Sequence, residues 1–253
     1  MPARRCCAPA PGSARDLAQD FGHPLTTRGW HHLKDGVRTG ERGFDKECGT
    51  DFSGYLATQP ELSHQSESAM SQAPRLTATH LADQDDFGDF PHVMDAGGGD
   101  GTLLTAVLTR FPELCGSLYA TAEGLAQAPD RLAVAGLTER CAPRVGDFIA
   151  SVPAGADLDP ATSVPHDWSG EDCVGILRHC RAALPVLGRM LVVEPLLPSL
   201  VDPRIAGRYL GDLNMLVNVG GRERTREDVT ELCANAGLAV TSVTALPAPP
   251  PSR

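Results

Sequence analysis

A glycine-rich segment, Asp95-Ala96-Gly97-Gly98-Gly99-Asp100-Gly101, has the clearest capacity for ligand binding in this sequence. The apolar run HVM precedes it and an amphipathic run, residues 102–108, follows it, an order typical of strand, loop and helix. Glycine has no Cβ and tolerates positive φ, so such a loop lets the backbone approach a ligand closely. Four glycines in five positions carry a backbone entropy cost that a plain turn does not need, which favours a ligand-binding loop.

The sequence of this loop does not match the patterns that bind two common ligands, NAD and ATP. A dinucleotide loop has glycines at G-x-G-x-x-G, but the sixth position is Thr102 counted from Gly97 and Leu104 counted from Gly99. The Gly-Lys-Ser/Thr ending of a P-loop is also missing. Binding of NAD or ATP is therefore disfavoured.

What remains is an acidic residue followed by glycines at alternate positions, which resembles the first motif of methyltransferases that use S-adenosylmethionine (SAM). Further segments resemble one family among them, the plant-type and bacterial small-molecule O-methyltransferases that modify phenols, flavonoids and polyketides. These segments are Val145-Gly-Asp-Phe148, His166-Asp167-Trp168, Asp212-Leu-Asn-Met-Leu216 and Gly220-Gly-Arg-Glu-Arg-Thr225. The resemblance is clearest from Val93 to Leu246.

The resemblance implies a role for each matching residue. Asp95, Gly97, Gly99 and Gly101 would surround the methionine part of SAM, and Asp147 and Phe148 would flank its adenine. His166 would be the catalytic base, oriented by the carboxylates of Glu194 and Glu223.

These roles agree with the chemistry of methyl transfer. The sulfonium leaving group is already activated, so the protein has to position the acceptor and remove its proton. A phenol of pKa ~10 loses that proton most readily to a histidine, whose usual pKa is ~6.5. Taken without the resemblance, each residue has a plainer interpretation: His166 as a solvated loop histidine, Glu194 as a carboxylate at a strand end, and Glu223 as an acid ahead of a helix.

The acceptor site is less defined. Aromatic residues make up only 5% of the chain, so aliphatic and methionine side chains should line the pocket. Our candidates for acceptor contacts are Met70, Asn214 and Met215, although both methionines are equally compatible with core packing. No metal site is expected.

Three departures from the family pattern indicate a divergent member. Ala120 stands where the family has the aspartate that binds the ribose hydroxyls, and Glu123 would replace it only with a displaced loop. Residues 159–165 contain two prolines and Asp159 where the family has a buried strand, so we expect a short, distorted strand or loss of activity. Most of the family's N-terminal dimerisation domain has no counterpart, so we expect a weakened homodimer.

Composition narrows the partners. The net charge of −10 disfavours nucleic acid or an anionic membrane, and no segment is long and apolar enough to span a bilayer. A small aromatic molecule is the better partner. Eight cysteines without a CxxC pair, and an N-terminus without a signal-peptide core, indicate a cytoplasmic protein with free thiols.

Apolar runs alternate with amphipathic stretches after Pro91, which predicts an α/β fold with a doubly wound, mostly parallel, Rossmann-like sheet. We predict helices that begin after Ser169 and Thr225, and a final strand over residues 238–246 that closes the sheet. The predicted organisation is a disordered tail (1–15), a helical N-terminal remnant for dimerisation or substrate capping (16–89), a SAM-binding catalytic domain (90–247) and a second disordered tail (248–253).

Two functions remain open. The first is a SAM-dependent O-methyltransferase with a phenolic or polyketide-like acceptor. The second is a SAM-binding family member that is inactive or repurposed for another tailoring reaction, which Ala120 and the altered strand favour. An NAD-dependent oxidoreductase is a distant third, because the glycine spacing is wrong.

Overall fold

The computed structural model describes residues 15–70, 72–84, 87–162 and 164–246. Both predicted disordered tails lie outside these residues, apart from Arg15, which begins helix α2 (Arg15–Phe21). The predicted domain boundary at residue 90 stays a prediction.

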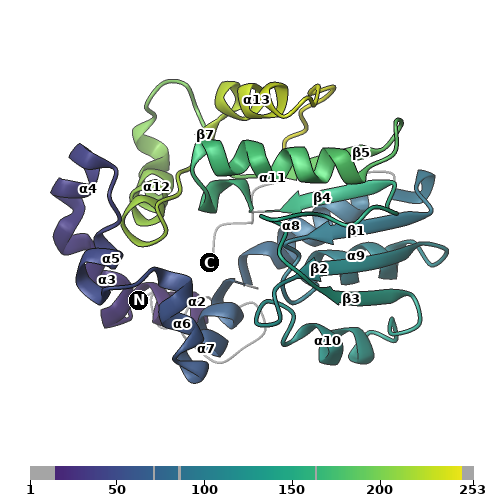
Figure 1. The fold of residues 1–253 in the computed structure, drawn as a ribbon, viewed down its shortest axis with the longest axis horizontal. Helices are drawn as coiled ribbons and strands as arrows, with labels where there is room; N and C mark the ends of the chain where they lie inside the picture. The colour runs from purple at the N-terminus through teal and green to yellow at the C-terminus, as the bar shows by residue number, and fades with distance from the viewer. Residues whose placement is uncertain (1–14, 71, 85–86, 163, 247–253) are drawn as a thin grey trace.

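A five-stranded sheet forms the centre of the molecule (Figure 1). Its strands lie in the order β3 (Cys141–Val145), β2 (Cys115–Ala120), β1 (His92–Ala96), β4 (Leu158–Thr162) and β5 (Arg189–Val193), and each neighbouring pair is parallel. Chain order reverses between β1 and β4, and ligands of such sheets bind at the carboxyl ends of the strands at this switch point. The predicted doubly wound α/β fold is confirmed.

Helices cover both faces of this sheet. On one face lie α8 (Gln72–Gln84), α9 (Thr102–Arg110) and α10 (Ala128–Val134), and on the other lie α11 (Gly170–Ala183) and α13 (Arg226–Asn235). Helix α9 buries four apolar residues at helical spacing, Leu103, Leu104, Val107 and Leu108, against β1, β2 and α8. Each large aliphatic side chain buried in this way stabilises the fold by roughly 1.5–3 kcal/mol.

Two helix starts were predicted correctly. The Ser169 side chain accepts a hydrogen bond from the Asp172 backbone N–H, and Thr225 forms a capping box with Asp228. Each cap satisfies a backbone N–H that the first turn of a helix leaves unpaired. The caps are local, so the sequence is enough to place them.

The predicted final strand is wrong, because residues 238–246 form no strand. Leu238 and Leu246 pack against the core, but Val240 and Val243 remain exposed. Strand propensity depends on burial against a neighbouring strand, and these valines have no such surface.

The proline-containing strand β4 does form. It pairs with β5 over its whole length, but it pairs with β1 only through Leu158 and Val93. Asp159 is buried and has a partner: its carboxylate accepts a hydrogen bond from the backbone N–H of Ala96 at 3.2 Å. The Asp159 side chain thus pairs with a backbone N–H of β1 that lies past the point where the two strands pair through their backbones.

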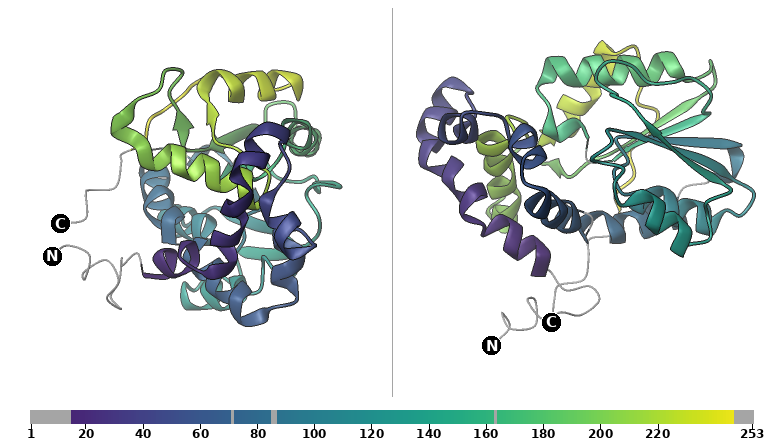
Figure 2. Two further views of the ribbon diagram at one scale, coloured as in Figure 1. Left: turned by 90° about the vertical axis from the view of Figure 1, so that its left-hand side faces the viewer. Right: turned by 60° about the horizontal axis from the view of Figure 1, so that its bottom comes forward.

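The N-terminal part of the chain is helical. After α2 come α3 (Pro24–Arg28), η1 (Gly29–His32), α4 (Leu33–Thr39), α5 (Gly43–Cys48), α6 (Phe52–Ala57), α7 (Pro60–Met70) and, after α8, η2 (Phe87–Asp89). Elements η1, α4 and α5 pack on α12 (Ala206–Asn218), which lies apart from the sheet in Figure 1 and in the right-hand view of Figure 2. Among the described residues, no helix combines the length and apolar character that crossing a bilayer requires.

Candidate active site

The glycine loop follows β1 and turns directly into α9. Gly97, Gly99 and Gly101 all have positive φ, at 84°, 51° and 77°. A Cβ would meet Val164 at Gly97 and Leu118 at Gly101, both within 2.8 Å, whereas a Cβ at Gly99 would meet nothing within 4 Å. Packing therefore requires glycine at the two ends of the loop, while Gly99 leaves backbone open to a ligand.

Asp95 lies beneath this loop. It is 1% exposed, and neither carboxylate oxygen has a hydrogen-bond partner among the described residues. Burial, and then the nearby charges of Asp159 and Asp100, hold the pKa of Asp95 well above its usual value. The carboxyl group packs directly against Gly98, where a Cβ would overlap it.

Residues from the loops after β3 and β4 contact the glycine loop. Val164 lies beneath Gly97, and the Phe148 ring lies beside it. The Phe148 and Trp168 rings make an edge-to-face contact, with centroids 6.2 Å apart. Asp147 is exposed, and its carboxylate accepts the Ile149 backbone N–H at 2.9 Å. The fold thus joins the segment that carries Phe148, the glycine loop and the His166 loop at the switch point.

His166, Glu194 and Glu223 form one cluster, as predicted from the sequence. The Nδ1 atom of His166 lies 3.2 Å from a Glu194 oxygen and 3.7 Å from a Glu223 oxygen. Its Nε2 atom lies 3.5 Å from Asp167, whose side chain is 47% exposed. Nδ1 thus faces the two glutamates and Nε2 faces the solvent side.

A small second sheet brings the two glutamates together. Strands β6 (Leu196–Leu197) and β7 (Arg224–Thr225) pair in parallel, with Leu196 opposite Arg224. Glu194 precedes β6 by two residues and Glu223 immediately precedes β7. The Asp212 carboxylate on α12 also accepts the backbone N–H of Glu223 at 2.8 Å.

The cluster changes the proton affinity of His166. Burial lowers the pKa of His166, but the adjacent carboxylates of Glu194 and Glu223 and the charge of Asp167 outweigh burial and raise it to about 10. The pKa of His166 is thus well above the usual histidine value of ~6.5. The imidazolium form therefore prevails near neutral pH. The three side chains also bring one nitrogen and two oxygens within 4.8 Å of one another, a spacing that a cation can bridge.

The ribose position departs from the family pattern, as expected. Ala120 ends β2 and is buried, and its carbonyl accepts the Gly146 N–H at 2.9 Å. Glu123 is exposed in the turn that follows. The described end of β2 therefore carries alanine where the family has aspartate, and the carboxylate of Glu123 lies three residues further on.

The predicted acceptor residues lie on two separate helices. Met70 ends α7 and is 45% exposed, whereas Asn214 and Met215 are half-buried on α12. The Asn214 side-chain oxygen accepts hydrogen bonds from Trp30 at 3.3 Å and Asn218 at 2.9 Å, so it connects α12 to η1. Asn214 therefore has a structural role in joining these two elements, and its predicted contact with the acceptor stays a prediction.

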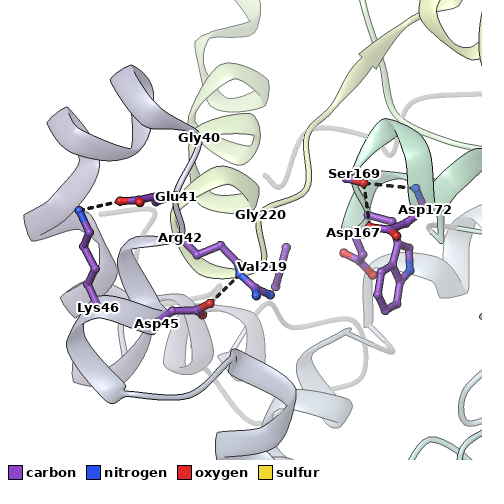
Figure 3. A pocket seen from close by; sticks show the side chains of 11 residues that line it. Gly40, Glu41, Arg42, Asp45, Lys46, Asp167, Ser169, Asp172, Val219 and Gly220 are labelled. Carbon is purple, nitrogen blue, oxygen red and sulfur yellow. Dashed lines mark hydrogen bonds and ion pairs between the residues drawn. The ribbon is translucent and has the colours of Figure 1, made fainter.

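A cleft of about 750 Å³ opens beside the cluster (Figure 3). On one side lie Arg42, which pairs with Asp45 at 2.8 Å, and Lys46, which pairs with Glu41 at 3.1 Å. The other side includes Asp167 and Trp168, the two residues after His166. The cleft therefore reaches the residues that follow His166, although His166, Glu194 and Glu223 are not among the described residues that line it.

The sequence analysis missed Arg224, which is 3% exposed and contacts the backbone on both sides of His166. Its place in the GGRERT segment was a signal, but arginines are mostly exposed, and nothing local indicates burial.

Comparison with known proteins agrees with this architecture. A family model described as the O-methyltransferase domain matches residues 30–239. The chain is 43% identical to O-demethylpuromycin-O-methyltransferase of Streptomyces alboniger over 88% of its length, and 35% identical to aclacinomycin 10-hydroxylase RdmB of Streptomyces purpurascens over 87%. It also superimposes on the crystal structure of NcsB1, an O-methyltransferase from neocarzinostatin biosynthesis, in complex with SAM and 2-hydroxy-5-methyl naphthoic acid.

That superposition has a TM-score of 0.83 at 32% identity, and it covers 92% of this chain and 70% of NcsB1. The chain covers 60% of the puromycin enzyme and 63% of the hydroxylase, and so spans less than two thirds of these curated relatives.

Proposed function

Because the chain belongs to the O-methyltransferase domain family, we propose that it transfers a methyl group from SAM to a hydroxyl group of a small aromatic acceptor, with His166 as the base. One observation carries the proposal. Val164, two residues before His166, lies directly beneath Gly97, so the loop for the methyl donor and the loop for the base are in contact at the switch point of the sheet.

The glycine loop fits a ligand of this kind. At Gly99 the backbone has positive φ and there is open space where any other residue would place a Cβ. SAM supplies an activated methyl group, and NcsB1, a relative of the same fold, was crystallised with it. Gly97, Gly99 and Gly101 would hold its methionine part, and Phe148 would contact its adenine.

The acceptor hydroxyl proton would be taken up by His166. The two glutamates occupy Nδ1 of His166, so Nε2 is the atom that receives the acceptor hydroxyl proton. As the oxygen–methyl bond forms and the sulfur–methyl bond breaks, this proton stays on the ring as imidazolium. Glu194 and Glu223 stabilise that cation, which is why a raised pKa of His166 suits an acceptor hydroxyl of pKa ~10.

A second function is favoured by a specific observation. A relative at 35% identity is named as a hydroxylase, and this chain has Ala120 where a ribose-binding carboxylate is expected. A protein that binds SAM without transferring its methyl group would fit both facts.

The test is to incubate the protein with methyl-labelled SAM and a mixed library of phenols and aromatic hydroxy acids, and to measure SAM affinity by calorimetry. We expect labelled methyl ethers and SAM binding, and we expect Gly99→Val to abolish binding, because valine strongly disfavours this φ and fills the open space. SAM binding without any labelled product would support the second function. A folded Gly99→Val variant with unchanged SAM affinity would refute the cofactor assignment.

A further inference from the structure

A buried arginine holds the loop that carries His166. Arg224 is 3% exposed, and its guanidinium donates one hydrogen bond to the carbonyl of Pro165 and another, at 2.8 Å, to the carbonyl of Trp168. Among the described residues, no carboxylate lies within ion-pair distance of it. A buried cation is costly unless its surroundings compensate it, and here the two loop carbonyls do so together with the carbonyl of Arg222, at 3.4 Å.

The carbonyl of Pro165 belongs to the same peptide group as the N–H of His166. That N–H donates to a Glu194 oxygen at 3.3 Å, while the other Glu194 oxygen lies 3.2 Å from Nδ1 of the His166 ring. One peptide group is therefore held by a cation at its oxygen and by a carboxylate at its nitrogen. The same carboxylate orients the ring of the base.

Neighbouring contacts restrict the loop further. The Arg222 backbone N–H donates to the His166 carbonyl at 2.8 Å, and a Cβ at Gly221 would overlap that carbonyl oxygen. The Cys173 thiol also donates to the Pro165 carbonyl, at 2.9 Å. The segment from Gly221 to Arg224 thus fixes both ends of the His166 loop, and Arg224 supplies the positive side-chain charge among these contacts.

We propose that Arg224 is a positioning residue of this site: through the Pro165–His166 peptide, its guanidinium holds the Glu194 carboxylate against the His166 ring. The proposal rests on the proposed function for its catalytic consequence, but the contacts that carry it do not depend on that function. Arginine is required because its planar fork can reach two carbonyls, whereas a lysine ammonium on a flexible stem cannot hold both in the same geometry.

The experiment is a double-mutant cycle between Arg224→Met and Glu194→Gln, with Arg224→Lys as the conservative variant. Arg226→Met is the matched control, because Arg226 is two residues away and exposed. We expect Arg224→Met to lower kcat by about 10- to 100-fold with the KM for SAM within about threefold, since orientation of the base is lost and SAM contacts are retained. The kcat of Arg224→Lys should lie between those of the parent and of Arg224→Met, and the kcat of Arg226→Met should be within about twofold of that of the parent.

The cycle separates positioning from general support of the fold. If Arg224 acts through Glu194, the double variant should be no more than about threefold slower than Glu194→Gln alone. If the kcat losses of the two single variants multiply in the double variant, the proposal is overturned. If Arg224→Met does not fold, the cycle with Arg224→Lys decides in the same way.

A second readout needs no turnover and so separates this proposal from the proposed function. The pKa of the His166 ring is followed by NMR in the parent and the three variants of the cycle. Glu194→Gln should lower this pKa strongly in the parent background and much less when Arg224 is already replaced. An equal decrease in both backgrounds would overturn the positioning role, while absence of methyl transfer by the parent would count against the proposed function alone.

Discussion

Replacement of His166 by glutamine should remove the base and leave the cofactor loop intact. Glutamine keeps much of the size and hydrogen bonding of histidine, and the side chain that packs beneath Gly97 is that of Val164. General base catalysis typically contributes 10²- to 10⁴-fold, so kcat should fall by roughly that factor while SAM affinity changes by a factor of a few.

The structure predicts an unusual pH dependence for the parent. With the pKa of His166 at about 10, roughly one ring in a thousand is neutral at pH 7 and roughly one in ten at pH 9. A raised pKa keeps the base protonated, so activity is gained as pH rises: kcat/KM should increase about tenfold per pH unit from 7 to 9. A histidine of ordinary pKa would instead give a flat profile above pH ~7.

The assay compares parent and His166→Gln at pH 7 on phenols of decreasing pKa. The loss should be largest for phenols of pKa ~10 and should shrink for phenols of pKa ~7, because solvent then supplies the phenolate without a base. A loss that is independent of acceptor pKa, or a variant as fast as the parent, would show that His166 does not take the proton.

Two other perturbations test the buried charges. Glu194→Gln should move the rising limb of the kcat/KM profile to lower pH, because it removes a carboxylate that raises the pKa of His166. It should also lower the plateau of the profile, because the ring is less well held. A rising limb at the same pH as in the parent would contradict the contact between Glu194 and His166. Asp159→Asn should stabilise the fold above pH 6, because burial raises the pKa of Asp159 from 3.8 to about 6. Asp159 should therefore lower the parent's free energy of unfolding by up to ~3 kcal/mol as pH rises through this window. In urea unfolding the variant should show a smaller fall, because Asp95 and Asp167 still titrate.

The features that could be predicted from the sequence depend on neighbours along the chain. The glycine loop of Gly97, Gly99 and Gly101, the caps at Ser169 and Thr225, and the alternation of strands and helices all follow from local conformational preference and periodicity. The segments around His166, Glu194 and Glu223 were recognised by their resemblance to family motifs, and the structure brings these residues together.

Other features depend on partners far away in the sequence. Residues 238–246 look like a strand but find no strand to pair with, whereas the proline-containing β4 forms because β5 accepts its whole length. In both segments long-range pairing outweighs local propensity. Residue type alone likewise did not indicate that Asp159 would find the Ala96 N–H as its partner.

The sequence by itself thus determined the fold class, the ligand loop and the residue types of the site. Only the tertiary structure decided the chemistry of that site. Pairing of β6 with β7 brings Glu223 to the side of Glu194, and the two carboxylates beside one imidazole outweigh the effect of burial and raise the pKa of His166 to about 10. Arg224, 58 residues from His166 along the chain, becomes part of the site for the same reason. Electrostatic interactions depend on distance in space and on exclusion of water, and the order of residues specifies neither until the chain has folded.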